Sequence, residues 1–186
     1  MEPAAILKLD YEDYRELPND GRRYEIIDGG LFVSPAPTVR HQRIVGRLFN
    51  ALYNHVEAAR LGEVLQAPLD VVLGDHDIVQ PDIVYISPGR QAILEEACIQ
   101  GAPDLVVEVL SPTSRRTDER TKRLLYAQFG IPEYWLLDPD LELAKVFRLE
   151  GRAYPEPRVL EAERSEELTT ELLPGFRLAV ARVFGR

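Results

Sequence analysis

The sequence is poor in cysteine and has no long apolar run. Cys98 is the only cysteine among 186 residues, so the chain cannot form an internal disulfide, and this excludes the disulfide-rich class of small secreted domains. No segment reaches the roughly 18 to 20 consecutive apolar residues that a membrane-spanning helix needs. The first residues also lack the basic segment that opens a secretory signal. We therefore expect a cytoplasmic protein without a membrane partner.

The sequence also lacks an excess of positive charge. It contains 22 Lys and Arg against 31 Asp and Glu, a formal net charge of −9, which argues against a protein that coats nucleic acid by bulk attraction. Segment 115–123 is a local exception, because its five basic residues outnumber its two acidic ones and leave about +3. Within it we expect Arg115, Arg116 and Arg120 to contact nucleic acid.

Length and pattern predict one α/β domain over residues 1–186, because an apolar fraction of 45% is ordinary for a globular protein of this size. Apolar residues recur every three or four positions over 39–60 and 115–129, which indicates two helices. Short helices are expected at 11–17 and 93–98, a β-hairpin at 23–33, and strands at 63–66, 69–73, 83–86, 105–110, 133–137 and 143–149. We expect a mixed β-sheet flanked by helices on both faces, an α/β (α+β) fold with an N-terminal β-hairpin extension.

Two carboxylates stand in or beside apolar runs that read as buried strands. Glu108 interrupts the run 105–110, and Asp82 opens the run 83–86. A carboxylate in such a place is costly to bury unless a cation compensates it. Neighbouring strands would bring Asp82 and Glu108 to one point. The plainer interpretations are that Asp82 is a strand-entry or turn aspartate and that Glu108 forms a buried salt bridge.

Lys122 is the third candidate, because the expected helix places it on the side that faces the sheet. Positions 122, 125, 126 and 129 share one helical face, and Leu125, Tyr126 and Phe129 must pack inward. The inward ammonium would pair with Glu108. The plainer interpretation is a surface lysine that pairs with Asp118 one turn earlier.

These groups suit metal-dependent hydrolysis of a phosphodiester. Asp82, Glu108 and the backbone carbonyl of Val109 would hold Mg²⁺ or Mn²⁺, which prefer oxygen ligands. The cation lowers the pKa of a bound water and polarises the phosphoryl oxygen, and Lys122 neutralises the charge that builds on the phosphate. Asp82, Glu108 and Lys122 are thus the expected catalytic residues.

Three further residues are candidate auxiliaries of this site. Glu25, in the first hairpin strand, is either a third acid beside the metal or part of a solvated strand face. His41, at the start of the long helix, would reach a phosphate or a metal-bound water, or would only make a hydrogen bond at the helix entry. Gln80 lies two residues before Asp82 and so shares its face of an extended strand, which would place it in the lining of the site.

Several motifs together resemble a known family. They are Tyr24 to Gly29, Ser34 to Pro37, His41, Val79 to Asp82, Gly101 to Pro112 and Glu133 to Pro139. In this order they are similar to the Uma family of restriction endonuclease-like proteins, within the PD-(D/E)XK nuclease superfamily. The resemblance runs from about Tyr11 to the C-terminus. It implies a restriction-endonuclease-like core, a divalent metal and DNA as substrate.

The sequence departs from the superfamily pattern at one position. The pattern has Lys two residues after the Glu, where this chain has Leu110, so Lys122 would have to supply the amine. Nuclease relatives often work as dimers, and we expect a homodimer or a higher homo-oligomer. A catalytically inactive nuclease-fold module for nucleic-acid or protein interaction is the main alternative, and a phosphodiesterase acting on small nucleotides is a third.

Overall fold

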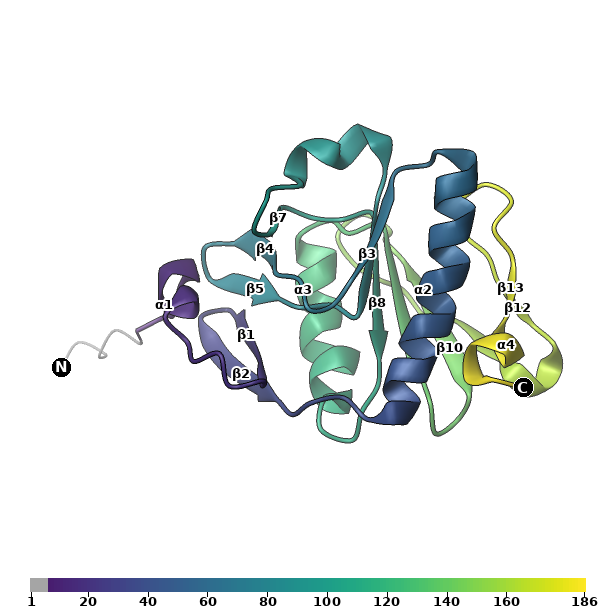
Figure 1. Cartoon of the computed structure of the whole chain (residues 1–186), viewed down its shortest axis with the longest axis horizontal. Coiled ribbons are helices and arrows are strands. Elements are labelled where there is room, and N and C mark those ends of the chain that lie inside the picture. The colour runs from purple at the N-terminus through teal and green to yellow at the C-terminus, as the bar shows by residue number, and fades with distance from the viewer. Residues whose placement is uncertain (1–6) are drawn as a thin grey trace.

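The computed structural model describes residues 7–186. Most strands belong to two sheets of six and five strands (Figure 1). A small two-stranded pair, β12 (Glu167–Leu168) and β13 (Leu178–Ala179), lies near the C-terminus. Within residues 7–186, no helix has both the length and the apolarity needed to cross a bilayer.

The six-stranded sheet is the centre of the fold. Its spatial order is β11 (Arg158–Glu161), β10 (Leu143–Arg148), β9 (Glu133–Asp138), β8 (Leu105–Val109), β6 (Ile83–Ile86) and β3 (Glu63–Gln66). Only β8 and β9 run parallel, because the helical segment between them carries the chain back to the start of the sheet. The other neighbours are antiparallel.

The five-stranded sheet contains the N-terminal hairpin. Its order is β2 (Gly30–Ser34), β1 (Arg23–Ile27), β5 (Asp77–Val79), β4 (Val71–Gly74) and β7 (Ile99–Gln100). Asp28 and Gly29 join the two hairpin strands with φ of 50° and 76°. Two successive residues with positive φ give the tight turn whose twist matches that of the strands, and Gly29 adopts such a φ without steric cost.

One face of the six-stranded sheet is covered by α2 (Val39–Ala59) and α4 (Val180–Phe184). The apolar stripe of α2 includes Leu48 and Leu52, which are fully buried and pack with Trp135 of β9. In Figure 1, α2 crosses the sheet on the side next to the C-terminal segments. His41 is buried in the first turn of this helix, so α2 carries a polar side chain to the edge of the core.

The other face of the sheet is covered by η2 (Thr117–Lys122) and α3 (Arg123–Gln128). Tyr126 is fully buried there and meets Tyr134 edge to face, with ring centroids 5.1 Å apart. The first of these segments is a π-helix, a wider turn that often occurs at functional sites. Strand alternation turns Glu108 toward this face, because its neighbours Val107 and Val109 pack on the α2 side.

The elements differ from the sequence-based expectation in several places. The helix expected at 93–98 is absent: a 3₁₀ turn, η1 (Pro88–Ile93), ends at Ile93, and residues 94–98 form an irregular turn in which Leu94 bridges to Ile99 of β7. The strand expected at 69–73 begins at Val71, and the separate short strand β5 was not expected. The single helix expected at 115–129 contains the π-helical segment. α1 (Tyr11–Arg15) ends two residues early.

Candidate active site

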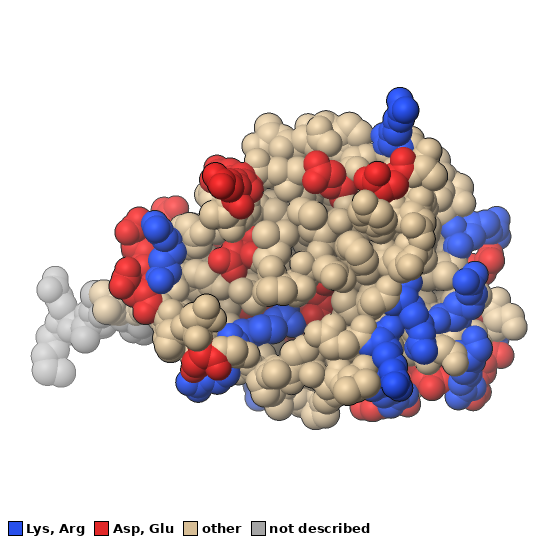
Figure 2. All heavy atoms as spheres, viewed as in Figure 1, with Lys and Arg blue, Asp and Glu red and all other residues tan. Residues whose placement is uncertain are grey.

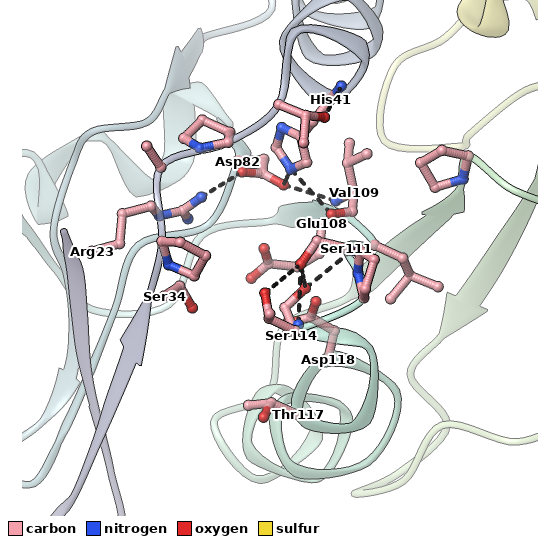
Figure 3. A pocket seen from close by; sticks show the side chains of 18 of the residues that line it. Arg23, Ser34, His41, Asp82, Glu108, Val109, Ser111, Ser114, Thr117 and Asp118 are labelled. Atoms are coloured by element: carbon pink, nitrogen blue, oxygen red, sulfur yellow. Dashed lines mark hydrogen bonds and ion pairs between the residues drawn. The ribbon is translucent and has the colours of Figure 1, made fainter. Parts of the chain in front are cut away.

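A pocket of about 470 Å³ opens where the start of α2, the end of β8 and the beginning of η2 meet. Its walls are two loops that contain proline, residues 34–38 before α2 and residues 111–114 after β8. Four carboxylates line its inner part, Glu25, Asp82, Glu108 and Asp118, and we call this set the acidic cluster. Figure 3 shows Arg23, His41, Asp82, Glu108 and Asp118 directed into this space from different elements.

Strand pairing brings Asp82 and Glu108 together. Ile83 of β6 lies opposite Val107 of β8 in an antiparallel register, so the next pair along is Asp82 and Glu108. Directly opposed residues in such a pair have Cβ atoms about 4.5–5.5 Å apart and point to the same face. Both side chains are only 3% exposed. The two carboxylates expected to converge therefore share one pocket.

Asp82 is held in its charged form by three donors. Arg23 Nη1 lies 2.8 Å from Oδ1, the backbone N–H of Val109 donates to Oδ2 at 2.8 Å, and His41 Nε2 lies 3.1 Å from the same oxygen. Burial raises the pKa of Asp82, but the hydrogen bond from His41 and the charge of Arg23 outweigh burial and hold the pKa at about 2. Asp82 is thus ionised throughout the physiological range.

Lys122 lies at the centre of the other three carboxylates. Its Nζ is 2.8 Å from Glu25 Oε1, 2.8 Å from Glu108 Oε1 and 3.4 Å from Asp118 Oδ1. Lys122 is buried, and the charges of Glu108, Glu25 and Asp118 outweigh burial and raise its pKa well above the usual value. The sequence-based expectation that Lys122 faces inward and meets Glu108 matches this placement, and the pair with Asp118 is present as well.

Glu108 has a carboxyl whose pKa is raised strongly by its surroundings. Lys122 and the hydroxyl of Tyr126 both donate to Oε1, Tyr126 at 2.7 Å. Burial, together with the charges of Asp118, Asp82 and Glu25, outweighs Lys122 and raises the pKa of Glu108 to about 8. Burial likewise raises the pKa of Asp118 against the opposing effect of Lys122. In the absence of another cation, a proton on Glu108 relieves part of the repulsion at neutral pH.

The charges of this cluster fit a divalent cation. Four buried carboxylates face two bases, the buried Lys122 and the half-buried Arg23, so two negative charges are uncompensated when all four carboxylates are ionised. Asp118 Oδ1 is buried without a hydrogen-bond partner in residues 7–186. Carboxylate and carbonyl oxygens are the ligands that Mg²⁺ and Mn²⁺ prefer. No three His, Cys, Asp or Glu side chains of residues 7–186 form a ready-made metal cage, so the fit rests on Asp82, Glu108 and a backbone oxygen.

The first turn of α2 covers the side of the site next to Asp82. Thr38 caps the helix by accepting a hydrogen bond from the backbone N–H of His41. His41 Nε2 also lies 3.1 Å from the carbonyl oxygen of Val109. Because the Val109 oxygen and the Asp82 carboxylate are both acceptors, Nε2 carries a proton. The helix N-terminus adds partial positive charge next to Asp82.

The structure brings some of the expected auxiliary residues together and not others. Glu25 is buried and belongs to the acidic cluster, and His41 touches Asp82. Gln80 was expected to line the site, but its side chain donates to Tyr14 and to Asp70, at 3.0 and 2.8 Å, and lies outside the pocket. The β6 strand begins only at Ile83, so the extended alternation that would align Gln80 with Asp82 does not apply.

The three arginines expected to contact nucleic acid have different surroundings. Arg115 makes two hydrogen bonds to Asp138, at 2.6 and 3.2 Å, and a third to Asp140, so its charge is already neutralised. Arg115 is therefore a poor phosphate ligand, contrary to the expectation. Arg116 and Arg120 are exposed and make no ion pair within residues 7–186. For these two, contact with nucleic acid stays a prediction.

Three residues of the site, Arg23, Asp118 and Tyr126, carried a signal that sequence reasoning did not use. Arg23 is two positions before Glu25 on β1, so strand alternation alone puts both on one face. Asp118 was considered only as a helical partner of Lys122, but the two together are the buried residues of the π-helix. The hydroxyl of Tyr126 belongs to the same group, because it lies one turn after Lys122 and also reaches Glu108.

Comparison with known proteins agrees with this fold. A crystal structure of a protein from Anabaena variabilis, described as "a putative nuclease belonging to DUF820", superposes with a TM-score of 0.80 and 24% identity over 95% of this chain and 97% of that one. At this identity the likeness concerns the fold. No curated protein matches the chain significantly. The model of the Uma2 family, described as "Putative restriction endonuclease", matches residues 11–181, so the chain belongs to the Uma2 family.

Proposed function

We propose that the protein is a nuclease that hydrolyses phosphodiester bonds of DNA with the help of Mg²⁺ or Mn²⁺. The observation that carries the proposal is the acidic cluster, four buried carboxylates with one buried lysine at the inner end of a single pocket. Burying charged side chains is costly and adds little to the stability of the fold. A catalytic or binding role accounts for their presence at this site.

Asp82, Glu108 and the carbonyl of Val109 are the groups that would hold the cation. Asp82 is ionised at physiological pH, and Glu108, whose pKa is raised to about 8, would have to give up its proton to hold the cation. The Val109 carbonyl accepts from His41 but has a second lone pair. When bound, the cation supplies Lewis-acid activation of water and of the phosphoryl oxygen.

The remaining charged groups would act on the phosphate. Lys122 is fixed between Glu25, Glu108 and Asp118, so its ammonium is already in place to offset the negative charge that develops during attack. Arg23 lines the same pocket and holds Asp82 at 2.8 Å. It orients that carboxylate and adds positive charge where an anionic substrate enters. His41 positions Asp82 and the Val109 carbonyl together.

The family points to DNA as the substrate, and a duplex cut in both strands needs two such sites. We therefore propose a homodimer, in which the exposed side chains of Leu141 and Val159 are candidate contacts. The single cysteine keeps the reducing cytoplasm as the expected compartment.

Replacing one cluster carboxylate tests the proposed function. Asp82→Asn keeps the shape of the side chain and removes its charge, so Mn²⁺-dependent nicking of supercoiled plasmid should fall at least 100-fold, a factor that corresponds to about 2.7 kcal/mol. The control is Asp75→Asn, at an exposed turn position, which should nick like the parent.

Circular dichroism must show that Asp82→Asn is folded. If the folded variant nicks plasmid as fast as the parent, Asp82 has no catalytic role and the assignment of the site is wrong. If the parent hydrolyses a small model diester but leaves plasmid intact, the substrate is a small nucleotide and not DNA.

One observation favours a second candidate, a nuclease-fold module without catalysis. Both oxygens of Asp82 and one oxygen of Glu108 already have protein donors, Arg23, His41, Val109 and Lys122. In that case the arginine and the lysine would be permanent counterions. Calorimetric titration with Mn²⁺ separates the two, because the module would give no heat at millimolar metal.

A further inference from the structure

A second hollow of the surface has the opposite charge to the active-site pocket. It measures about 770 Å³ and lies between the exposed side of α2 and the C-terminal segment that contains α4. Of the residues that line it, Arg43, Arg47, Arg177 and Arg182 are basic and none is Asp or Glu. We call it the arginine groove. Figure 2 shows Lys and Arg gathered over α2 and α4, on a face that elsewhere is mostly neutral or acidic.

Most of these arginines are available to a ligand. Arg43 and Arg182 are exposed and make no ion pair within residues 7–186. Arg47 has only one long hydrogen bond, 3.5 Å to the carbonyl of Val183. Arg177 alone is paired, at 2.9 Å with Glu167. A chain with a net charge of −9 thus keeps a groove with no acidic residue in its lining and with three arginines that make no ion pair within residues 7–186.

The arginine groove is connected to the active site along α2. Arg40, Arg43, Arg47, Asn50 and Asn54 are spaced by three or four residues, so they form one stripe of the helix. Arg40 lines the active-site pocket, and the residues from Arg43 onward line the groove. Arg40 and Arg47 are about 10 Å apart along the axis. Arg40 pairs with Asp140 and Glu142, at 3.7 and 3.5 Å, so the unpaired positive charge of the stripe begins at Arg43, one helical turn beyond Arg40.

We propose that the arginine groove binds the phosphate backbone of double-stranded DNA beyond the cleavage site. The inference rests on the proposed nuclease function and adds to it a second contact surface. Arginine and asparagine side chains are common donors to phosphate oxygens, and a continuous row of them fits a substrate with regularly repeated charge. The groove would hold the duplex in register while the scissile phosphate lies in the pocket.

The test uses a pair of charge reversals and a matched control pair. Arg43→Glu with Arg182→Glu changes the two walls of the groove, and neither residue makes a hydrogen bond or ion pair within residues 7–186. Arg15→Glu with Arg152→Glu changes the net charge equally at exposed positions of α1 and of the turn after β10. Binding of a fluorescent DNA duplex to the full chain is followed by anisotropy in EDTA, where no cleavage occurs.

The groove variant should bind the duplex at least tenfold more weakly at about 50 mM salt. The slope of log affinity against log salt should also become shallower by about 1.8, or about 0.9 for each lost phosphate contact. The control pair should change affinity less than twofold. Equal binding by both variants overturns the proposal. So does a groove variant that loses affinity for polyglutamate but not for DNA, because the groove would then serve an acidic protein.

Plasmid nicking by the parent and the groove variant separates this inference from the proposed function. If the parent nicks and the groove variant needs more DNA but reaches the same rate at saturation, both proposals stand. A parent that never nicks, together with a groove variant that binds weakly, refutes the nuclease function and leaves the groove. A nicking parent with unchanged binding by the groove variant refutes the groove alone.

Discussion

Glu108 shows most directly how burial and charge decide the behaviour of a residue in this protein. Its carboxyl is 3% exposed and faces three other acids, so its pKa rises to about 8 even though Lys122 is 2.8 Å away. Asp82, directly before the adjacent strand β6, has a pKa of about 2, because Arg23 and His41 act on it directly. Neighbouring carboxyls whose pKa values shift in opposite directions are typical of sites at which protons or metals exchange.

The raised pKa of Glu108 predicts a stability that declines with pH in EDTA. The protonated form is favoured in the folded state, so its contribution is complete below the unfolded value of 4.5 and is lost as the pH rises toward about 8. Asp82 contributes no slope in this window, because its pKa of about 2 lies below it. Thermal unfolding from about pH 5 to 8 should show a falling Tm.

Glu108→Gln cannot ionise and should flatten this decline and raise the Tm at pH 8. Glu57→Gln, at an exposed position of α2, is the matched control and should keep the slope of the parent. A Tm of the parent that is constant or rises between these pH values would show that Glu108 is not protonated in the fold.

Lys122 gives a second prediction at the residue scale. Lys122→Met keeps the length of the side chain but leaves Glu25, Glu108 and Asp118 without their shared ammonium. Loss of one partner of a buried ion pair costs about 3–5 kcal/mol. Urea unfolding in EDTA should show a loss of this size.

Added Mn²⁺ should restore part of the stability of Lys122→Met, since a cation in the cluster compensates the same carboxylates. A variant as stable as the parent in EDTA would mean that the ammonium is not needed to hold these acids.

At the scale of elements, local sequence signals predicted most of the fold. The hairpin at 23–33, the long helix and the central strands follow from turn residues and apolar periodicity, and the structure has them. The π-helical widening at 117–122 was not predictable in this way, because it depends on where Lys122 and Asp118 find partners across the chain. The short strand β5 depends on Ile78 pairing with Ile26, a contact over a long separation.

Gly46 offers a test of the helix that carries His41 and the arginine stripe. It is exposed in the interior of α2, and a Cβ there would meet no heavy atom within 4 Å. Gly46→Ala should stabilise the protein by about 0.5–1 kcal/mol, because alanine loses less backbone entropy on folding. The expected rise in Tm is about 1–4 °C.

Gly130 is the matched control for this substitution. A Cβ at Gly130 also meets no heavy atom within 4 Å, but its φ is 72°, a conformation that alanine adopts only with strain. Gly130→Ala should therefore lower the Tm. If both variants change stability in the same direction, the helical conformation assigned to Gly46 is wrong.

At the scale of the whole molecule, the sheets explain how residues far apart in sequence form one site. β1 supplies Arg23 and Glu25, the entry to β6 supplies Asp82, β8 supplies Glu108, and η2 supplies Asp118 and Lys122. Asp82 and Glu108 could be selected from sequence because they stand beside or inside apolar runs, and Lys122 because it shares a helical face with Leu125, Tyr126 and Phe129. The interactions of Arg23 with Asp82 and of Gln80 with Tyr14 and Asp70 could not, since they depend on how the two sheets pack.

The whole molecule also divides its charge between two surfaces. The acidic cluster lies inside the pocket, and the arginine groove lies along the other side of α2. Because the arginines of the groove are gathered on one surface, a net charge of −9 is compatible with the proposed binding of DNA. The unpaired arginines of the groove would attract the DNA backbone, and the carboxylates of the pocket would bind the cation.

Calorimetric titration of the protein with Mn²⁺ at pH 8 tests the central claim most directly. We expect the parent to bind one cation per chain, and folded Asp82→Asn or Glu108→Gln to give no binding heat. Absence of heat in the parent, or a parent-like isotherm for both variants, would contradict it.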